Sequence, residues 1–210
     1  MIKVYKYGEV SNDEIFSRAV MPSNVEQTVA DIIADVRQNG DAALLKYNEK
    51  FDGAVMTSVE VKEEELDDAI SSLEPEFIAI MEEAAENIRA FHEKQVRNSF
   101  VISEKEGVVI GQKVIPVEKA GLYVPGGTAA YPSSVLMNCI PAKIAGCGEI
   151  VITTPATGGS VNPAILAAAK IAGADRIFKV GGAQAIAALA YGTETVPKVD
   201  KIVGPGNAFV

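Results

Sequence analysis

The chain has 210 residues, of which 48% are hydrophobic and 22% are charged, proportions typical of a folded protein. No apolar run approaches the roughly 18 uncharged residues of a membrane span, and the N-terminus lacks the apolar core and cleavage site of a signal peptide. The two cysteines, Cys139 and Cys147, are too few for a disulfide framework, so we expect a cytoplasmic protein that does not engage membranes.

The net charge of -9 is unevenly distributed along the chain. Residues 119–210 contain 7 Lys and Arg and 4 Asp and Glu, whereas residues 1–118 contain 12 and 24. Of the 18 glycines, 13 follow residue 118. The acidic first part offers no basic stripe for phosphates, which disfavours nucleic acid as a partner. The contrast predicts two regions with different roles.

The first 20 residues are predicted to contain an extended segment and one helix. Residues 1–7 are typical of a short strand or an extended arm. Ser11 and Glu14 have the spacing of a capping box, in which two side chains satisfy free N–H groups at a helix start. This spacing predicts a helix from Ser11 to Val20 that Pro22 ends.

Two further helices are predicted to meet at a glycine. Ser23 and Glu26 repeat the capping-box spacing, and apolar residues then recur at helical intervals up to Gly40. We expect Asp41 to cap the next helix, which ends at the turn Asp52-Gly53.

The rest of the first region alternates polar and apolar segments. Val59 and Val61 suggest a brief strand, and the acidic residues 63–68 are interpreted as a solvated first helical turn rather than a metal site. Pro75 opens the longest helix. Its predicted apolar stripe consists of Phe77, Met81, Ala84, Ile88 and Phe91.

A change of period marks the end of this region. Residues 100–103 and 108–115, joined by a polar turn, predict an antiparallel β-hairpin. Pro116 and the charged pair that follows it place the boundary between residues 118 and 119.

The second region has a βαβ pattern. A strand recurs every 25 to 28 residues and a helix follows each, which implies a parallel sheet with right-handed crossovers. The predicted strands are 121–124, 149–153, 176–180 and 201–203, and the predicted helices are 134–145, 162–172 and 183–191. The fold class is therefore α/β: a helical N-terminal region with a hairpin, then a Rossmann-like sheet.

The loops after the four strands are rich in glycine and proline: 125–127, 154–155, 181–182 and 204–207. In open parallel sheets, ligands bind beyond the carboxyl ends of the strands. All four loops are thus predicted to converge on one binding face. Glycines let the backbone approach a ligand, although tight turns alone would also explain them.

Three polar side chains stand beside these loops: Tyr123, Gln184 and Asn207. A tyrosine can stack on a ring or donate from its hydroxyl, and amides can pair with ribose or carboxamide groups. Neither the G-x-G-x-x-G fingerprint nor a P-loop occurs in the sequence, so the usual nucleotide signatures are missing.

Metal binding and acid–base catalysis find little support in the residues. Cys139 and Cys147 are interpreted as small buried residues of a helix, and the single histidine, His92, as a packing or dipole partner. Glu194 follows a glycine turn and is interpreted as a loop carboxylate rather than a general base. We therefore assign no metal ligand and no catalytic residue within this chain.

Together the motifs resemble the histidinol dehydrogenase family. They are GLYVPGG at 121–127, PSSVLM at 132–137, PA at 141–142, IAGC at 144–147, VGGAQAIAALA at 180–190, VPKVDKI at 196–202 and GPGNAFV at 204–210. Residues 91–95, FHEKQ, extend the resemblance into the first region.

The resemblance implies an aldehyde-dehydrogenase-like scaffold and a zinc-containing homodimer that oxidises L-histidinol through the aldehyde to L-histidine, reducing two NAD molecules. The family's NAD-contacting tyrosine, glutamine and asparagine correspond to Tyr123, Gln184 and Asn207. Residues 119–210 would then be the NAD-binding domain, and residues 1–118 part of a first α/β domain.

The sequence departs from the family in length, because members are roughly twice as long. The family's zinc ligands and its glutamate–histidine pair for proton transfer lie beyond the motif that ends at Val210. We therefore expect this chain to be a truncated form that is inactive alone. Two alternatives stay open: a related dehydrogenase of another small primary alcohol, such as a sulfonated diol, and a non-catalytic nucleotide-binding or assembly module.

Overall fold

The computed structural model describes residues 4–16, 25–126 and 130–210. The described helices are α1 (Asn12–Ile15), α2 (Val25–Asp52), α3 (Glu63–Ser71), α4 (Pro75–His92), the 3-10 turn η1 (Glu93–Gln95), α5 (Pro132–Ala145), α6 (Pro163–Ala172) and α7 (Gly182–Tyr191). The described strands are β1 (Phe100–Ile102), β2 (Ile110–Gln112), β3 (Lys119–Tyr123), β4 (Glu149–Thr154), β5 (Arg176–Lys179) and β6 (Lys201–Val203).

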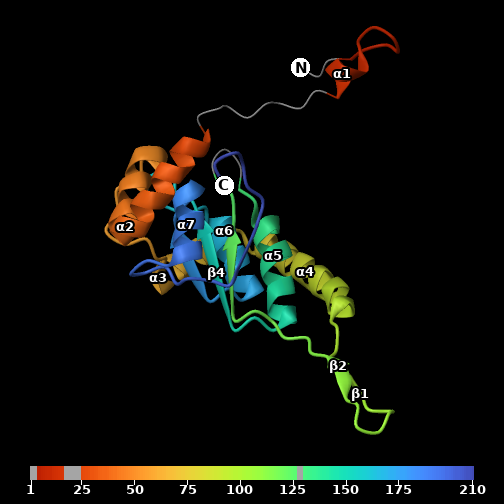
Figure 1. The fold of residues 1–210 in the computed structure, drawn as a ribbon. Coiled ribbons are helices and arrows are strands. Elements are labelled where there is room, and N and C mark those ends of the chain that lie inside the picture. Colours follow the sequence, from red (N-terminus) through yellow and green to blue (C-terminus); the bar gives the residue numbers. More distant parts are fainter. Residues whose placement is uncertain (1–3, 17–24, 127–129) are drawn as a thin grey trace.

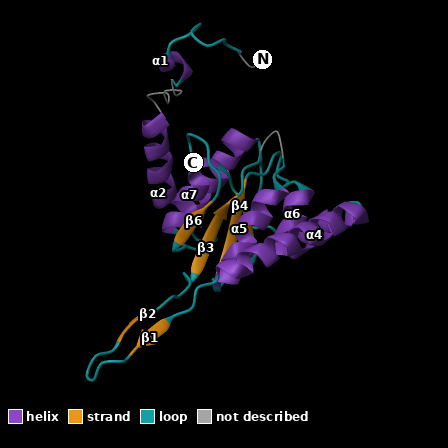
Figure 2. Ribbon diagram, turned by 90° about the vertical axis from the view of Figure 1, so that its right-hand side faces the viewer, coloured by secondary structure: helices purple, strands orange, loops and turns teal. Residues whose placement is uncertain are grey.

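A four-stranded parallel sheet in the order β5-β4-β3-β6 forms the centre of the fold. In the register of its central strands, Tyr123 lies opposite Thr153, and Thr153 lies opposite Phe178. Helices α2 and α7 pack together on one face, while α4, α5 and α6 cover the other (Figures 1 and 2). The predicted α/β class and parallel sheet are confirmed.

The helices of the second region start and stop at the residues that favour those positions. Proline occupies the first turn of α5 and of α6, where its missing N–H costs nothing. Each helix ends at a glycine with positive φ, Gly146 at 88° and Gly173 at 79°. These boundaries hold the connections short, so each helix returns directly to the sheet.

Alternate residues of the strands fill two hydrophobic clusters, one on each face of the sheet. Ile150 and Ile152 of β4 point into the cluster beneath α5 and α6, and Val151 points into the cluster beneath α2 and α7. The first region contributes to both, since Met81 belongs to one cluster and Leu44 to the other. The predicted boundary at residues 118 and 119 stays a prediction, but the residues on its two sides share these clusters.

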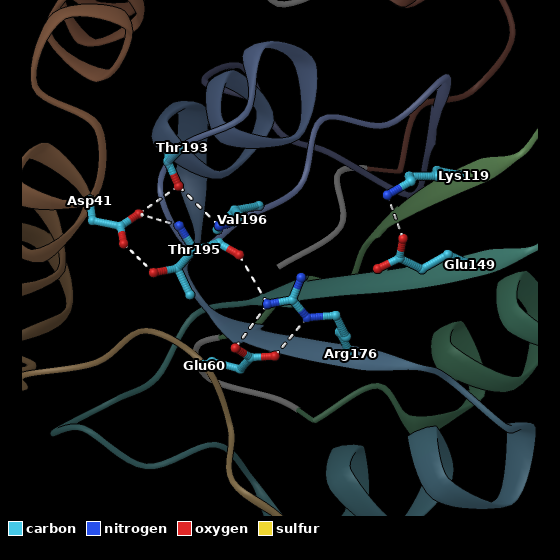
Figure 3. A network of polar contacts seen from close by, with 8 residues as sticks. All are labelled: Asp41, Glu60, Lys119, Glu149, Arg176, Thr193, Thr195 and Val196. Carbon is cyan, nitrogen blue, oxygen red and sulfur yellow. Dashed lines mark hydrogen bonds and ion pairs between the residues drawn. The ribbon is translucent and has the colours of Figure 1, made fainter.

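Helix α2 is bent at Gly40, whose φ of 50° and ψ of -130° break the helical path. The prediction that Asp41 caps the following helical segment is wrong. Its carboxylate instead accepts hydrogen bonds from the Thr193 hydroxyl at 2.5 Å and from the Thr195 hydroxyl (Figure 3). The Asp41 N–H donates to Glu194 at 2.8 Å. The bend is thus fixed by the loop after α7 rather than by a local cap.

Residues 59–61 form a single antiparallel bridge between Glu60 and Phe178, and not the brief strand that was predicted. Lys179 N–H donates to the Val59 carbonyl at 2.6 Å, which is enough to attach this segment to the edge of the sheet. The Arg176 guanidinium binds both oxygens of Glu60, at 2.7 and 2.9 Å, and also donates to the Thr195 carbonyl (Figure 3).

Helix α3 starts as predicted with three glutamates in its first turn. One of them, Glu65, receives two hydrogen bonds of 2.9 Å from Lys179, whose side chain is only 9% exposed. The acidic turn therefore also neutralises a buried lysine of the sheet.

The apolar stripe predicted for α4 is partly wrong. Met81 is buried, and Ala84 and Ile88 pack against the core. Phe77 and Phe91 are 36% and 65% exposed, because the core-facing side runs through Ile78 and Ala85 instead. The buried face keeps Met81, Ala84 and Ile88 and extends toward Ile78 and Ala85, so it is rotated by less than one residue from the predicted stripe.

The remaining elements lie at the periphery. The predicted hairpin exists as β1 and β2 and projects from the body with every strand residue exposed (Figure 2). Helix α1 begins as predicted, with the Ser11 hydroxyl accepting from Glu14 N–H at 3.2 Å, but it ends at Ile15. The predictions for residues 1–3, for the stretch to Val20, and for Pro22 and Ser23 concern positions outside the described residues. No described helix has the length and hydropathy needed to cross a membrane.

Candidate functional site

A cavity of about 340 Å³ lies beyond the carboxyl ends of the strands, between α2 and α7. The loops after β3, β4, β5 and β6 all contribute to its wall, so the predicted convergence of the four loops is confirmed. Its lining includes Ile32, Phe51, Asp52, Tyr123, Gly126, Pro155, Gly181, Gly182, Gln184, Asn207 and Phe209. Gly127 and Thr128 of the first loop lie outside the described residues.

Pro155 lies between two glycine-containing loops and fixes their spacing. A Cβ atom on Gly126 would come within 2.6 Å of the Pro155 ring, and one on Gly181 would also come within 2.6 Å of it. Glycine is therefore required at both positions to let the loops close around the proline. These glycines shape the wall of the cavity by packing.

The loop after β6 approaches β3 in the same manner. Gly204 has a φ of 149°, and a Cβ there would lie 2.1 Å from the Tyr123 carbonyl oxygen. Only glycine permits this approach, which brings Asn207 to the cavity.

Tyr123 is at the end of β3 with its side chain almost wholly buried. Its hydroxyl oxygen accepts a hydrogen bond of 3.2 Å from Gly182 N–H, at the start of α7. Burial is the main cause that raises the pKa of this hydroxyl; the hydrogen bond from Gly182 N–H lowers the pKa by less, and the charge of Asp52 adds a smaller rise. The tyrosine therefore stays protonated at neutral pH, and its O–H is available as a donor. Its buried ring offers a ligand little surface for stacking.

Gln184 lies in the first turn of α7 and is 2% exposed. Its side-chain amide lines the cavity, yet within the described parts of the chain it makes no hydrogen bond. Its polar atoms are not among the buried ones that lack a partner, so they reach the open cavity, where a ligand with both donors and acceptors can replace water.

Asn207 is exposed at the mouth of the cavity. Its side-chain oxygen accepts from Phe209 N–H at 2.9 Å, an Asx turn that orients the amide. The two N–H groups of the amide remain available to a ligand. The structure thus brings all three predicted side chains to one cavity.

Helix α2 supplies a wall that the sequence reasoning missed. Ile32, Phe51 and Asp52 line the cavity although they are more than 70 residues before the first of the strand loops. The sequence interpretation treated Asp52 only as part of a turn. Its carboxylate is partly buried, which raises its pKa. A charged residue at the end of an amphipathic helix was the only local sign of this role.

Other candidate residues lie outside the cavity. His92 contacts Gln95 through Nδ1 at 2.7 Å, near the base of the hairpin. Glu194 is a loop carboxylate, as interpreted, and it binds Asp41. Cys139 is buried and donates to the Ala172 carbonyl at 3.5 Å. Burial raises the pKa of its thiol to about 12, so it has neither the thiolate of a nucleophile nor that of a metal ligand.

Zinc, which the family resemblance implies, does not fit the residues that the structure describes. In residues 4–16, 25–126 and 130–210, no group of three or more His, Cys, Asp or Glu converges in a way that could hold a metal ion. A structural or catalytic zinc needs three or four such ligands. We assign no step to a metal in this part of the chain.

Comparison with known proteins identifies the family. Residues 17–210 match the family model described as histidinol dehydrogenase. The chain belongs to the histidinol dehydrogenase family. Members of this family are oxidoreductases of histidine biosynthesis.

Several relatives illustrate the match. Histidinol dehydrogenase of Clostridium acetobutylicum is 50% identical over 216 residues, covering 100% of this chain and 50% of that protein. The protein of the same name from Pseudomonas syringae pv. syringae is 54% identical over 195 residues, covering 91% and 44%. A crystal structure of histidinol dehydrogenase from Elizabethkingia anophelis superimposes with a TM-score of 0.87 at 40% identity, covering 91% of this chain and 45% of that one. The chain thus spans about half the length of the histidinol dehydrogenases that it matches.

Proposed function

We propose that this chain supplies the NAD-binding part of an enzyme that oxidises L-histidinol through L-histidinal to L-histidine. The observation that carries this proposal is the Gln184 amide, which lines a cavity at the carboxyl edge of a parallel sheet and makes no hydrogen bond with the described residues. That position is where open α/β folds bind nucleotides.

The cavity wall matches the groups of NAD. Gln184 can both donate to and accept from a carboxamide, and the Tyr123 hydroxyl and the Asn207 amide can donate to ribose or phosphate oxygens. Ile32 and Phe209 provide apolar surface for a ring. This mixture of a few polar groups on an apolar wall is typical of a cofactor site.

Within the reaction, bound NAD would accept the hydride from the substrate alcohol. The residues of this chain would bind and orient the dinucleotide, and the wall formed by α2 and α7 would shield one side of it from water. Proton transfer and substrate binding would need residues that the family carries outside the stretch matched here. On this proposal the 210-residue chain alone does not turn over histidinol.

The assembly state and the location of the protein belong to the same proposal. The family resemblance implies a cytoplasmic homodimer with a small-molecule substrate. Light scattering on a protein of the relatives' full length should give the mass of two chains.

The test uses a protein of the relatives' full length that contains this chain. NADH formation is followed at 340 nm with L-histidinol and zinc, and a sulfonated diol serves as the competing substrate. We expect turnover with L-histidinol only. We further expect Gln184→Ala to weaken NAD binding by about 1 to 3 kcal/mol, as for a lost buried hydrogen bond, and the exposed Asn207→Ala to weaken it by about 0.5 to 1.5 kcal/mol. Turnover of the diol but not of histidinol would overturn the substrate assignment. Turnover of histidinol by the 210-residue chain alone would overturn the proposal that proton transfer and substrate binding need further residues.

A further inference from the structure

The second half of α2, residues 41–52, is held at its first residue by the loop that follows α7. The Asp41 carboxylate accepts a hydrogen bond of 2.5 Å from the Thr193 hydroxyl and another from the Thr195 hydroxyl (Figure 3). The Thr193 oxygen itself accepts from Val196 N–H at 3.0 Å, which leaves its own hydrogen for Asp41. Two hydroxyls of a loop more than 150 residues away in the chain therefore fix the start of this helical segment.

The same loop also fixes the residues that follow the segment. The Thr195 carbonyl accepts from the Arg176 guanidinium at 3.0 Å, and that guanidinium binds both carboxylate oxygens of Glu60 at 2.7 and 2.9 Å (Figure 3). Hydrogen bonds thus run from Asp41 through Thr195 and Arg176 to Glu60, so that both ends of residues 41–60 are attached to one loop. We call this set of residues the clamp: Asp41, Glu60, Arg176, Thr193 and Thr195.

The clamp is at the opposite edge of the sheet from the cavity. Arg176 is the first residue of β5, and the threonine loop follows the last turn of α7, so the clamp lies at the amino edge. None of its five members is among the described residues that line the cavity. The cavity is instead lined by the other ends of the same two helices, through Phe51 and Asp52 of α2 and Gln184 of α7. The clamp therefore joins the far ends of the two helices that bound the cavity.

The geometry of α2 shows how the clamp can affect the cavity. In the middle of the segment, the Asn48 amide donates to the Lys179 carbonyl at 2.7 Å, which is a second point of attachment. Without the clamp, the segment could rotate about this point. Asp52 lies four residues, or about 6 Å, beyond Asn48, so a rotation of about 10° would move it by about 1 Å. A displacement of that size is enough to spoil a binding site.

We propose that Asp41 and Thr195 are positioning residues, which hold the second half of α2 against α7 and so keep the cavity in the form that binds the dinucleotide. The proposal rests on the proposed function, because NAD binding reports the position of this wall. It differs from a purely structural role in its consequence. Loss of the clamp should weaken NAD binding, whereas an equally destabilising change elsewhere should not.

The test is calorimetric titration of the 210-residue chain with NAD, at a temperature at which circular dichroism shows every variant to be folded. Thr195→Val removes the hydroxyl but keeps the shape of the side chain and the carbonyl that binds Arg176. We expect this variant and Asp41→Ala to bind NAD about 3- to 30-fold more weakly, the usual range for coupling through residues that do not touch the ligand. Thr195→Ser keeps the hydroxyl and should retain most of the affinity.

The matched control is Asp175→Ala, which also deletes a carboxylate with several donors. Asp175 accepts from Lys143 at 2.8 Å and from Ile150 N–H at 2.7 Å, and Lys143 belongs to α5 on the opposite face of the sheet from α2. This variant should lower the melting temperature but leave NAD affinity within about 2-fold of the unmodified chain. In Thr195→Val, hydrogen exchange should become faster in residues 44–52 and stay unchanged in α6.

The outcomes separate the two proposals. No NAD binding by the unmodified chain would overturn the proposed function and this inference together. Unchanged NAD affinity in Thr195→Val would overturn the inference alone, and this variant decides the matter if Asp41→Ala does not fold. An equal loss of affinity in Asp175→Ala would also overturn the inference, because a general loss of stability would then explain the effect.

Discussion

Two polar side chains in the cavity, Gln184 and Asp52, have no partner within the described residues. Gln184 is almost wholly buried and Asp52 is partly buried, but neither has a polar side-chain atom among those that are both buried and without a partner, so both meet the solvent of the cavity. A few polar groups that face a cavity and bind no other residue are typical of a ligand site.

The partial burial of Asp52 gives a prediction for the dependence of stability on pH. Its pKa in the fold is raised by burial, so the fold favours its protonated form, and the charged form destabilises the fold as pH rises above the ordinary value of 3.8. Asp52→Asn should therefore raise the melting temperature of the ligand-free protein at pH 7 and change it less near pH 4. Scanning fluorimetry at both values checks this. If Asp52→Asn instead lowers the melting temperature relative to the unmodified chain, and lowers it more at pH 7 than at pH 4, the carboxylate has a protein partner.

For Asp35 we expect the opposite dependence of stability on pH, because its pKa is lowered in the fold. The hydrogen bond from Lys46, at 2.7 Å, is the main cause that lowers the pKa of Asp35 to about 2. This pair therefore contributes its stability above about pH 4 and loses it as pH falls through the value in the fold. In Asp35→Asn, the decline of the melting temperature between pH 4 and pH 2 should be shallower than in the unmodified chain. An unchanged decline would contradict the assignment.

Among the individual residues of the site, Tyr123, Gln184 and Asn207 were predictable because each lies at or just after the end of a strand in a recognisable βαβ pattern. The sequence did not predict Asp52, because α2 is placed at the cavity by packing against α7, which begins 130 residues after Asp52 in the chain. Local patterns carry no information on such a contact.

Among the elements, the bend of α2 depends on contacts from outside the helix. A Cβ on Gly40 would lie 2.2 Å from a Glu194 carboxylate oxygen. The glutamate could move away only by giving up its hydrogen bond with Asp41 N–H. The sequence located the interruption at Gly40 correctly, but it could not reveal that a distant loop holds it.

Substitution at this bend tests how strongly the bend depends on glycine and on Glu194. Gly53→Ala is a control for a methyl group added at a positive φ, since Gly53 has a φ of 61° with no atom within 4 Å of an added Cβ. We expect Gly53→Ala to cost about 1 kcal/mol and Gly40→Ala to cost about 2 to 4 kcal/mol, because the ψ of -130° at Gly40 is open to few residues besides glycine and the glutamate contact is also lost. Urea unfolding monitored by circular dichroism measures both. Equal costs would mean that Glu194 does not stabilise the bend.

The strands and helices of the second region were predictable to within about two residues, because proline, glycine and the apolar period mark their ends. Helix α4 was predicted in extent but not in orientation. Its core-facing side is set by α5 and α6, so Phe77 and Phe91 are more exposed than the stripe implied.

For the whole molecule, the two hydrophobic clusters join residues from before and after position 118. Ion pairs such as Arg176–Glu60 and Lys170–Asp67 cross the same boundary. We therefore expect α2 and α7 to unfold together. Hydrogen exchange measured by mass spectrometry in increasing urea should show both helices losing protection at the same concentration. Loss of protection in α2 well before α7 would show that residues 1–118 form a separate folding unit.

The central claim is that the cavity between α2 and α7 binds NAD. Its most direct test is titration of the 210-residue chain with NAD, comparing the unmodified chain, Gln184→Ala and Gln112→Ala, a control on the exposed hairpin. The account predicts that the unmodified chain and Gln112→Ala bind NAD equally, whereas Gln184→Ala binds it about 5- to 100-fold more weakly. No binding by the unmodified chain, or equal binding by Gln184→Ala, would contradict it.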